Sequence, residues 1–105
     1  MADKRSFPRK KKRLVVEFVA DGSKTSGFTW DLSYTGLFIA AHHLPKMGEM
    51  VTVTLHLPNG KKCQLIGKAV RARRVPAALA MSEPNGFSLM VSGYSEDYTA
   101  FMSSL

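Results

Sequence analysis

Apolar and polar residues alternate along much of the chain, and this period of two is typical of half-buried β-strands. In the first alternating run, one face carries the apolar residues Leu14, Val16, Phe18 and Ala20. The most regular run spans residues 51–57, where polar residues separate Val51, Val53, Leu55 and Leu57. Shorter strand-like segments lie at 28–30, 36–40, 63–75 and 87–91. The pattern therefore predicts six short antiparallel strands.

Turn-forming residues separate these segments at Asp21-Gly22-Ser23, Pro58-Asn59-Gly60 and Pro84-Asn85-Gly86. Segment 63–75 changes parity, because Cys63 and Leu65 occupy its early core positions and Val70 and Ala72 the later ones. We expect a β-bulge at Gly67, since a bulge bends a strand around a barrel.

The C-terminal segment has the signals of a short helix. Ser95 is a suitable N-cap, and Glu96 and Asp97 complement the dipole of the first turn. One face then carries Tyr98, Phe101, Met102 and Leu105. The fold class predicted is all-β: a small barrel over residues 13–105, closed or flanked at one end by this helix.

Residues 1–12 lack apolar periodicity and form a basic arm. The chain has a net charge of +7, and the excess is concentrated in Lys4, Arg5, Arg9, Lys10, Lys11, Lys12 and Arg13. Such a run is either a solvated arm or a docking site for nucleotide, nucleic acid or anionic lipid.

Cys63 is the only cysteine, so an internal disulfide is excluded and a core-packing role is expected. The start of the chain has no apolar stretch like that of a secretory signal, and no segment is long enough to span a membrane. These features predict a cytoplasmic protein.

Two short motifs suggest a ligand. Arg5-Ser6-Phe7-Pro8-Arg9 carries two guanidinium groups, each of which fits phosphate oxygens or the O6/N7 edge of guanine. Asp31-Leu32-Ser33-Tyr34-Thr35-Gly36 adds a carboxylate that can accept from the N–H edge of guanine, and a glycine that permits close backbone approach. Together they favour an anionic ligand that contains guanine.

Over residues 4–105 these motifs, in this order on this strand pattern, resemble the PilZ domain family. The resemblance implies a six-stranded antiparallel barrel with a short C-terminal α-helix. It also implies binding of the bacterial second messenger cyclic di-GMP through an R-x-x-x-R and a [D/N]-x-S-x-x-G motif. The matching residues here are Arg5, Arg9, Asp31, Ser33 and Gly36.

Several alternatives accompany this assignment. Arg9 and Arg13 also fit R-x-x-x-R, although Phe-Pro before Arg9 favours the Arg5/Arg9 register. Asp31 and Ser33 could cap the turn, and Gly36 could supply a positive φ there. Additional ligand contacts are considered at Lys4, Arg13, Arg71 and Arg73. Trp30 is expected in the core or at its rim.

Catalysis and metal binding find no support in the sequence. Ser33, Asp31, His42 and His43 include triad residue types but lack a nucleophile elbow. Adjacent histidines on a strand point to opposite faces and make a poor chelate. No enzyme, metal or cofactor is therefore expected.

The function predicted is that of a stand-alone cyclic di-GMP receptor, whose N-terminal arm becomes ordered on the ligand and signals to a protein partner still to be identified, or through a ligand-dependent dimer. One alternative is a constitutive protein-interaction module of the same fold. The other is a nonspecific single-stranded nucleic-acid binder, for which Phe28, Trp30 and Phe38 would stack bases, although all three fit barrel packing better.

Overall fold

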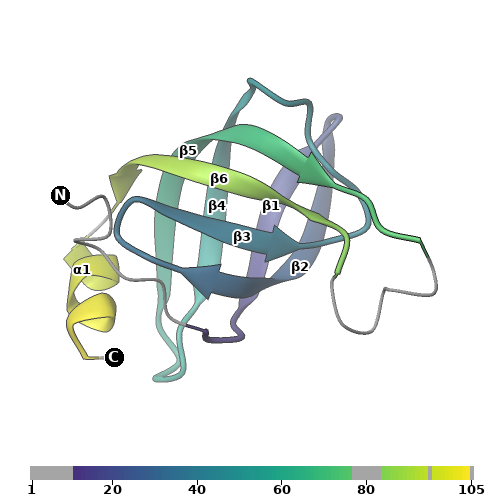
Figure 1. The fold of residues 1–105 in the computed structure, drawn as a ribbon. Coiled ribbons are helices and arrows are strands. Elements are labelled where there is room, and N and C mark those ends of the chain that lie inside the picture. The colour runs from purple at the N-terminus through teal and green to yellow at the C-terminus, as the bar shows by residue number, and fades with distance from the viewer. Residues whose placement is uncertain (1–10, 77–83, 95, 105) are drawn as a thin grey trace, which may run out of the picture.

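The protein is a closed β-barrel in a computed structural model, which describes residues 11–76, 84–94 and 96–104 (Figure 1). In these residues six antiparallel strands follow the order β1-β2-β3-β6-β5-β4 around the barrel. The elements are β1 (Val15–Ala20), β2 (Ser23–Leu32), β3 (Gly36–Ala40), β4 (Met50–His56), β5 (Lys62–Arg73), β6 (Gly86–Tyr94) and α1 (Glu96–Ser103). The predicted fold class, a six-stranded antiparallel barrel with a short C-terminal helix, is confirmed.

The barrel interior is filled by alternate residues of the strands, as the period of two requires. Each of the following is at most 2% exposed: Val16, Phe18, Ala20, Leu32, Leu37, Ile39, Val53, Leu55, Leu65, Phe87 and Leu89. Phe18 and Phe87 meet edge to face across the interior, with ring centroids 5.2 Å apart. The core predicted from alternation is therefore correct for β1 and β4.

Two hairpin turns have the backbone geometry that their residues favour. Asp21 and Gly22 connect β1 to β2 with φ values of 53° and 76°. Asn59 and Gly60 connect β4 to β5, with Gly60 at φ 86°. Positive φ at such positions is readily adopted by Gly and tolerated by Asp, which explains why these tight turns form.

The change of parity expected in β5 occurs at a different residue. Gly67 and Ala69 continue the buried set, whereas Val70 is 45% exposed and Ala72 is also exposed. The core position expected for Val70 is therefore wrong, whereas Ala72 pairs with Phe87 and shares its inner face as expected, although Ala72 is exposed. The reason lies in the pairing with β6, which decides where β5 changes face.

Val70 is the extra residue of a bulge on β5, because Ala69 pairs with Leu89 and Arg71 with the next residue, Ser88. A second register shift does occur beside Gly67, but its extra residue lies on β6. Gly67 has a packing role there, since a Cβ would lie 2.5 Å from the carbonyl oxygen of Met90.

The helix α1 lies at one end of the barrel, near the turn between β2 and β3 (Figure 1). Tyr98 and Met102 are its buried residues, and Phe101 is partly buried against the core. The face predicted for these three is thus confirmed. The N-cap expected at Ser95 and the core position expected at Leu105 lie outside the described residues.

Candidate ligand-binding face

The D-x-S-x-x-G motif spans the end of β2, the following turn and the start of β3. The Ser33 hydroxyl donates to the Gly36 carbonyl oxygen at 3.0 Å and accepts from the backbone N–H groups of Thr35 and Gly36 at 3.3 and 3.2 Å. Ser33 is only 1% exposed. Its hydroxyl therefore builds the turn, and the ligand contact that the motif implies for Ser33 stays a prediction.

Gly36 is required for close packing and not for an unusual φ. The glycines with positive φ in the described residues are Gly22, Gly48 and Gly60, so the positive φ considered for Gly36 is wrong. A Cβ at Gly36 would lie 2.9 Å from the carbonyl oxygen of Leu89 on β6. The motif glycine thus lets β3 approach β6.

A bulge turns Asp31 outward. Thr29 pairs with Ile39 and Asp31 with the next residue, Phe38, so Trp30 is the extra residue on β2. Without this residue, alternation would place Asp31 on the same inner face as Thr29, which is 1% exposed. The bulge instead leaves the core face to Leu32, and Asp31 is half-buried on the outer surface.

The bulge at Val70 has the same effect on two arginines of β5. Continuing the alternation from buried Ala69 would place Arg71 and Arg73 inside the barrel. The extra residue reverses the faces, so both arginines lie outside. Two bulges on separate strands therefore direct one carboxylate and two guanidinium groups to the barrel exterior.

These outward residues form one row across four neighbouring strands. Asp31 on β2 pairs with Phe38 on β3, Phe38 pairs with Ser88 on β6, and Ser88 pairs with Arg71 on β5. Arg73 lies two residues further along β5, on the same face. We call Asp31, Phe38, Ser88, Arg71 and Arg73 the candidate ligand-binding face.

Cations stack on aromatic rings along this side of the barrel. The guanidinium of Arg73 lies 4.6 Å from the Phe38 ring centroid, and that of Arg13 lies 4.1 Å from the Phe28 ring centroid. Phe38 is buried, but Phe28 is 38% exposed on the outer surface, so its expected packing in the barrel is wrong. The same rings fix the guanidinium planes by cation–π attraction.

The base of the N-terminal arm is fixed next to the motif. The Thr29 hydroxyl accepts from the Leu14 N–H at 2.8 Å and donates to the Lys12 carbonyl oxygen, while the Lys11 ammonium lies 5.5 Å from the Trp30 ring centroid. Trp30 is half-buried, as expected for a rim residue.

Thr29 was not singled out in the sequence, although a hydroxyl between the two aromatic residues Phe28 and Trp30 was a usable signal. The ligand contacts predicted at Lys4, Arg5 and Arg9 lie outside the described residues.

The helix α1 is hydrogen-bonded to the motif turn. The Tyr98 hydroxyl, which is fully buried, donates to the Ser33 carbonyl oxygen at 2.6 Å. Tyr34 and Ser103 share a second hydrogen bond between their hydroxyls at 3.1 Å. The spacing of α1 predicted only that Tyr98 faces the core, and this link between the turn and the C-terminal helix was missed.

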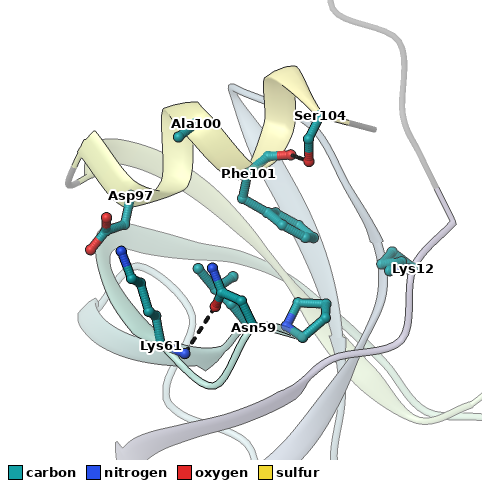
Figure 2. Close-up of a pocket in the computed structure, with 9 residues that line it drawn as sticks. Lys12, Asn59, Lys61, Asp97, Ala100, Phe101 and Ser104 are labelled. Carbon is teal, nitrogen blue, oxygen red and sulfur yellow. Dashed lines mark hydrogen bonds between the residues drawn. The ribbon is translucent and has the colours of Figure 1, made fainter.

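A groove of about 450 Å³ lies between α1 and the β4–β5 hairpin (Figure 2). Figure 2 shows Phe101 pointing from the helix toward the hairpin, while the N–H of Lys61 donates to the Asn59 side-chain oxygen at 2.9 Å. None of the residues of the candidate ligand-binding face lines this groove. The groove and the motif are therefore separate features.

The remaining reactive groups of the described residues include a buried thiol and two histidine–carboxylate pairs. Burial of Cys63, with a smaller contribution from Asp97, raises the pKa of its thiol to about 11, which supports the predicted packing role. His43 pairs with Asp21 and His56 with Glu17, each at 3.3 Å. His56 thereby lowers the pKa of Glu17. Among the described residues no three His, Cys, Asp or Glu side chains cluster as a metal site.

Comparisons with known proteins agree with this geometry. The family model for the PilZ domain matches residues 3–90. The solved structure of the Bacillus subtilis inhibitor of motility, MotI/DgrA, is similar with a TM-score of 0.79 and 16% identity. The match covers 98% of this chain and 50% of that one, so the chain spans half the length of that protein.

No curated protein matches the chain. Within its described helical residues, nothing has the length and apolar character needed to cross a bilayer. With the barrel order, the motif turn and the family match in agreement, the chain belongs to the PilZ domain family.

Proposed function

We propose that this protein is a cyclic di-GMP receptor and that the dinucleotide lies on the candidate ligand-binding face. The observation that carries the proposal is the pair of bulges at Trp30 and Val70, which turn Asp31, Arg71 and Arg73 outward on neighbouring strands. Bulges commonly re-aim side chains at functional sites. Family membership supplies the ligand class.

The chemistry of the face suits a ligand with two guanine bases and two phosphates. Asp31 can accept from the N–H edge of a guanine, while Arg71 and Arg73 can each donate two parallel hydrogen bonds to phosphate oxygens or to O6/N7 of the second base. Three strand spacings separate β2 from β5, or about 14 Å. This distance lets the charged groups engage different parts of one extended ligand.

The N-terminal arm is the second part of the proposed site. Its base at Lys12 is held by Thr29, two residues before Asp31, so a short segment suffices for Arg5 and Arg9 to reach the ligand. On this proposal residues 1–12 act as an arm on the barrel of residues 13–105. Ordering of the arm on the ligand would then present a changed surface to a protein partner.

A calorimetric titration of the full chain tests the proposal. Cyclic di-GMP should bind with a Kd in the micromolar range or tighter, whereas GTP and a short single-stranded oligonucleotide should give no comparable heat. Equal binding of the oligonucleotide, with a steep dependence on salt, would instead indicate a diffuse electrostatic binder. No heat with cyclic di-GMP at high micromolar concentration would refute the receptor.

A constitutive interaction module of the same fold is the second candidate. Its supporting observation is that the Ser33 hydroxyl is already used inside the turn, at 1% exposure. Such a module would bind its protein partner equally well with and without cyclic di-GMP. The titration above distinguishes the two candidates, since the module predicts no heat from the dinucleotide.

A further inference from the structure

A lysine at the centre of four exposed apolar side chains marks the outer surface of β4, β5 and β6. Lys68 on β5 pairs with Met50 on β4 and with Met90 on β6. Along β5, Ile66 and Val70 lie two residues before and two residues after Lys68. The residues between them, Gly67 and Ala69, face inward. We call Met50, Ile66, Lys68, Val70 and Met90 the lysine-centred apolar face.

All four apolar side chains of this face are exposed to solvent. Met50 is 56% exposed, Met90 54%, Ile66 46% and Val70 45%. Residues paired across strands lie about 5 Å apart, so the four side chains adjoin the aliphatic stem of Lys68 and make one continuous surface. Scattered single apolar residues need no explanation, but a contiguous group marks an interaction site.

We propose that the lysine-centred apolar face docks a partner protein that presents apolar side chains around a single carboxylate. The apolar ring would exclude water from the contact between the Lys68 ammonium and that carboxylate, which is the arrangement of an interface hot spot. The two methionines suit such a contact because their flexible, polarisable side chains adapt to the shape of the partner. This inference does not depend on the proposed ligand site.

Charge selects an acidic partner protein over a second copy of this chain. An isologous contact through this face would bring two Lys68 ammonium groups together, and the chain as a whole carries a net charge of +7. Arg71, next to Val70, adds positive charge at the edge, while Glu49, next to Met50, is the nearest acid in sequence. The face also lacks the Trp and Tyr side chains that characterise membrane-interface surfaces.

The docking face shares an edge with the candidate ligand-binding face. Met90 pairs with Gly36 of the D-x-S-x-x-G motif, and it lies two residues after Ser88 on β6. Arg71 directly follows Val70 on β5. A partner docked here would therefore border a ligand bound on the neighbouring strands, and it could contact both.

Site-specific photo-crosslinking in the cells that make the protein tests the proposal. A photoreactive residue at position 66 or 90 should cross-link to one protein, through a peptide that contains Asp or Glu beside apolar residues. The same residue at Val19 on β1, which is 55% exposed, should not. The identified protein is then purified, and its affinity is measured with and without cyclic di-GMP.

Two variants with a matched control decide the outcome. Val70→Asp should weaken this binding by at least about tenfold, while Val19→Asp should change it less than about twofold. Lys68→Glu should also lose at least about tenfold, and changing the contacted carboxylate of the partner to Lys should restore affinity. Circular dichroism confirms that each variant is folded.

Four results would overturn the proposal. The first is the absence of a specific cross-link from positions 66 and 90, and the second is a cross-link to a second copy of the chain. The third is binding to vesicles of 30% phosphatidylserine that Val70→Asp abolishes. The fourth is a partner whose affinity is unchanged by Lys68→Glu.

Discussion

The inner and outer parts of the D-x-S-x-x-G motif lie in opposite environments. Ser33 and Gly36 are buried, and their contacts are with the turn, with β6 and, through the Ser33 carbonyl oxygen, with Tyr98 of α1. Asp31 lies outside the barrel, in the same row as Phe38 and Arg71. The comparison suggests that the motif combines a structural part with a recognition part, which substitutions should separate.

The largest effect is expected from Tyr98→Ala, because Tyr98 of α1 is hydrogen-bonded to Ser33 in the structural part of the motif. This variant removes a fully buried aromatic side chain together with its hydrogen bond to Ser33, so the free energy of unfolding should fall by about 3–5 kcal/mol. Tyr98→Phe isolates the hydrogen bond and should cost about 1–3 kcal/mol. Urea denaturation measures both.

Tyr94→Ala is the matched control, because Tyr94 is 45% exposed although its ring centroid lies 5.3 Å from that of Tyr98. Its destabilisation should be clearly smaller. Equal losses from Tyr94→Ala and Tyr98→Ala would show that the link between α1 and the turn contributes nothing specific.

Arg73 lies on the same outer face as Asp31, the recognition part of the motif, and Arg73→Ala should lower ligand affinity. Losing a charge-assisted contact should weaken cyclic di-GMP binding by about 1.5–3 kcal/mol, roughly 10- to 150-fold, on the proposed function. Stability should fall by no more than about 1 kcal/mol, since only the exposed stack on Phe38 is lost. Calorimetry and urea denaturation give the two values.

Arg74→Ala provides the control for Arg73→Ala, because Arg74 directly follows β5 and is exposed. Arg74→Ala should weaken ligand binding by less than about 1 kcal/mol, as expected for a screened surface charge. If both variants lose the same affinity, the arginines act as a diffuse positive field and not as placed ligand contacts.

Gly36→Ala should destabilise the barrel by about 1–3 kcal/mol, because the added Cβ meets a backbone carbonyl that cannot move independently of β6. The control is Gly93→Ala on the same sheet, where a Cβ has no neighbour within 4 Å. Thermal unfolding should show a lower Tm for Gly36→Ala alone. A loss of ligand affinity without a change in Tm would assign Gly36 to recognition instead.

The smallest effect is a loss of stability at alkaline pH, and it concerns Cys63. Burial raises the pKa of its thiol to about 11, so the unfolded chain releases this proton at lower pH than the folded one. The contribution to stability is therefore complete below about pH 9 and is lost as the pH rises toward 11. The difference in unfolding free energy between wild type and Cys63→Ala, followed from pH 8 to 11, measures it.

A thiol that reacts with iodoacetamide at pH 8 as quickly as free cysteine would contradict this account of Cys63. Such a result would mean that the end of the barrel at β5 opens readily. The buried part of the motif, at Ser33 and Gly36, would then be less rigid than its contacts with α1 and β6 imply.

The alternation of apolar residues was sufficient to predict the strands, because a period of two follows directly from β geometry and needs no knowledge of neighbours. It identified Val16, Phe18, Val53 and Leu55 as core residues, and all four are at most 2% exposed. On β5 the prediction failed for Val70, because the change of face was placed at Gly67 and not at Val70. Bulge position depends on which residues of β6 pair with β5, and those lie about 20 residues further along the chain.

What the sequence determined by itself is the set of elements, the core of the most regular strands and the motif residues that identify the family. The faces on which Asp31, Arg71 and Arg73 lie were decided by tertiary structure, through the bulges at Trp30 and Val70. The physical reason is that hydrogen bonds between strands set the register. One extra residue in that register reverses every side chain beyond it.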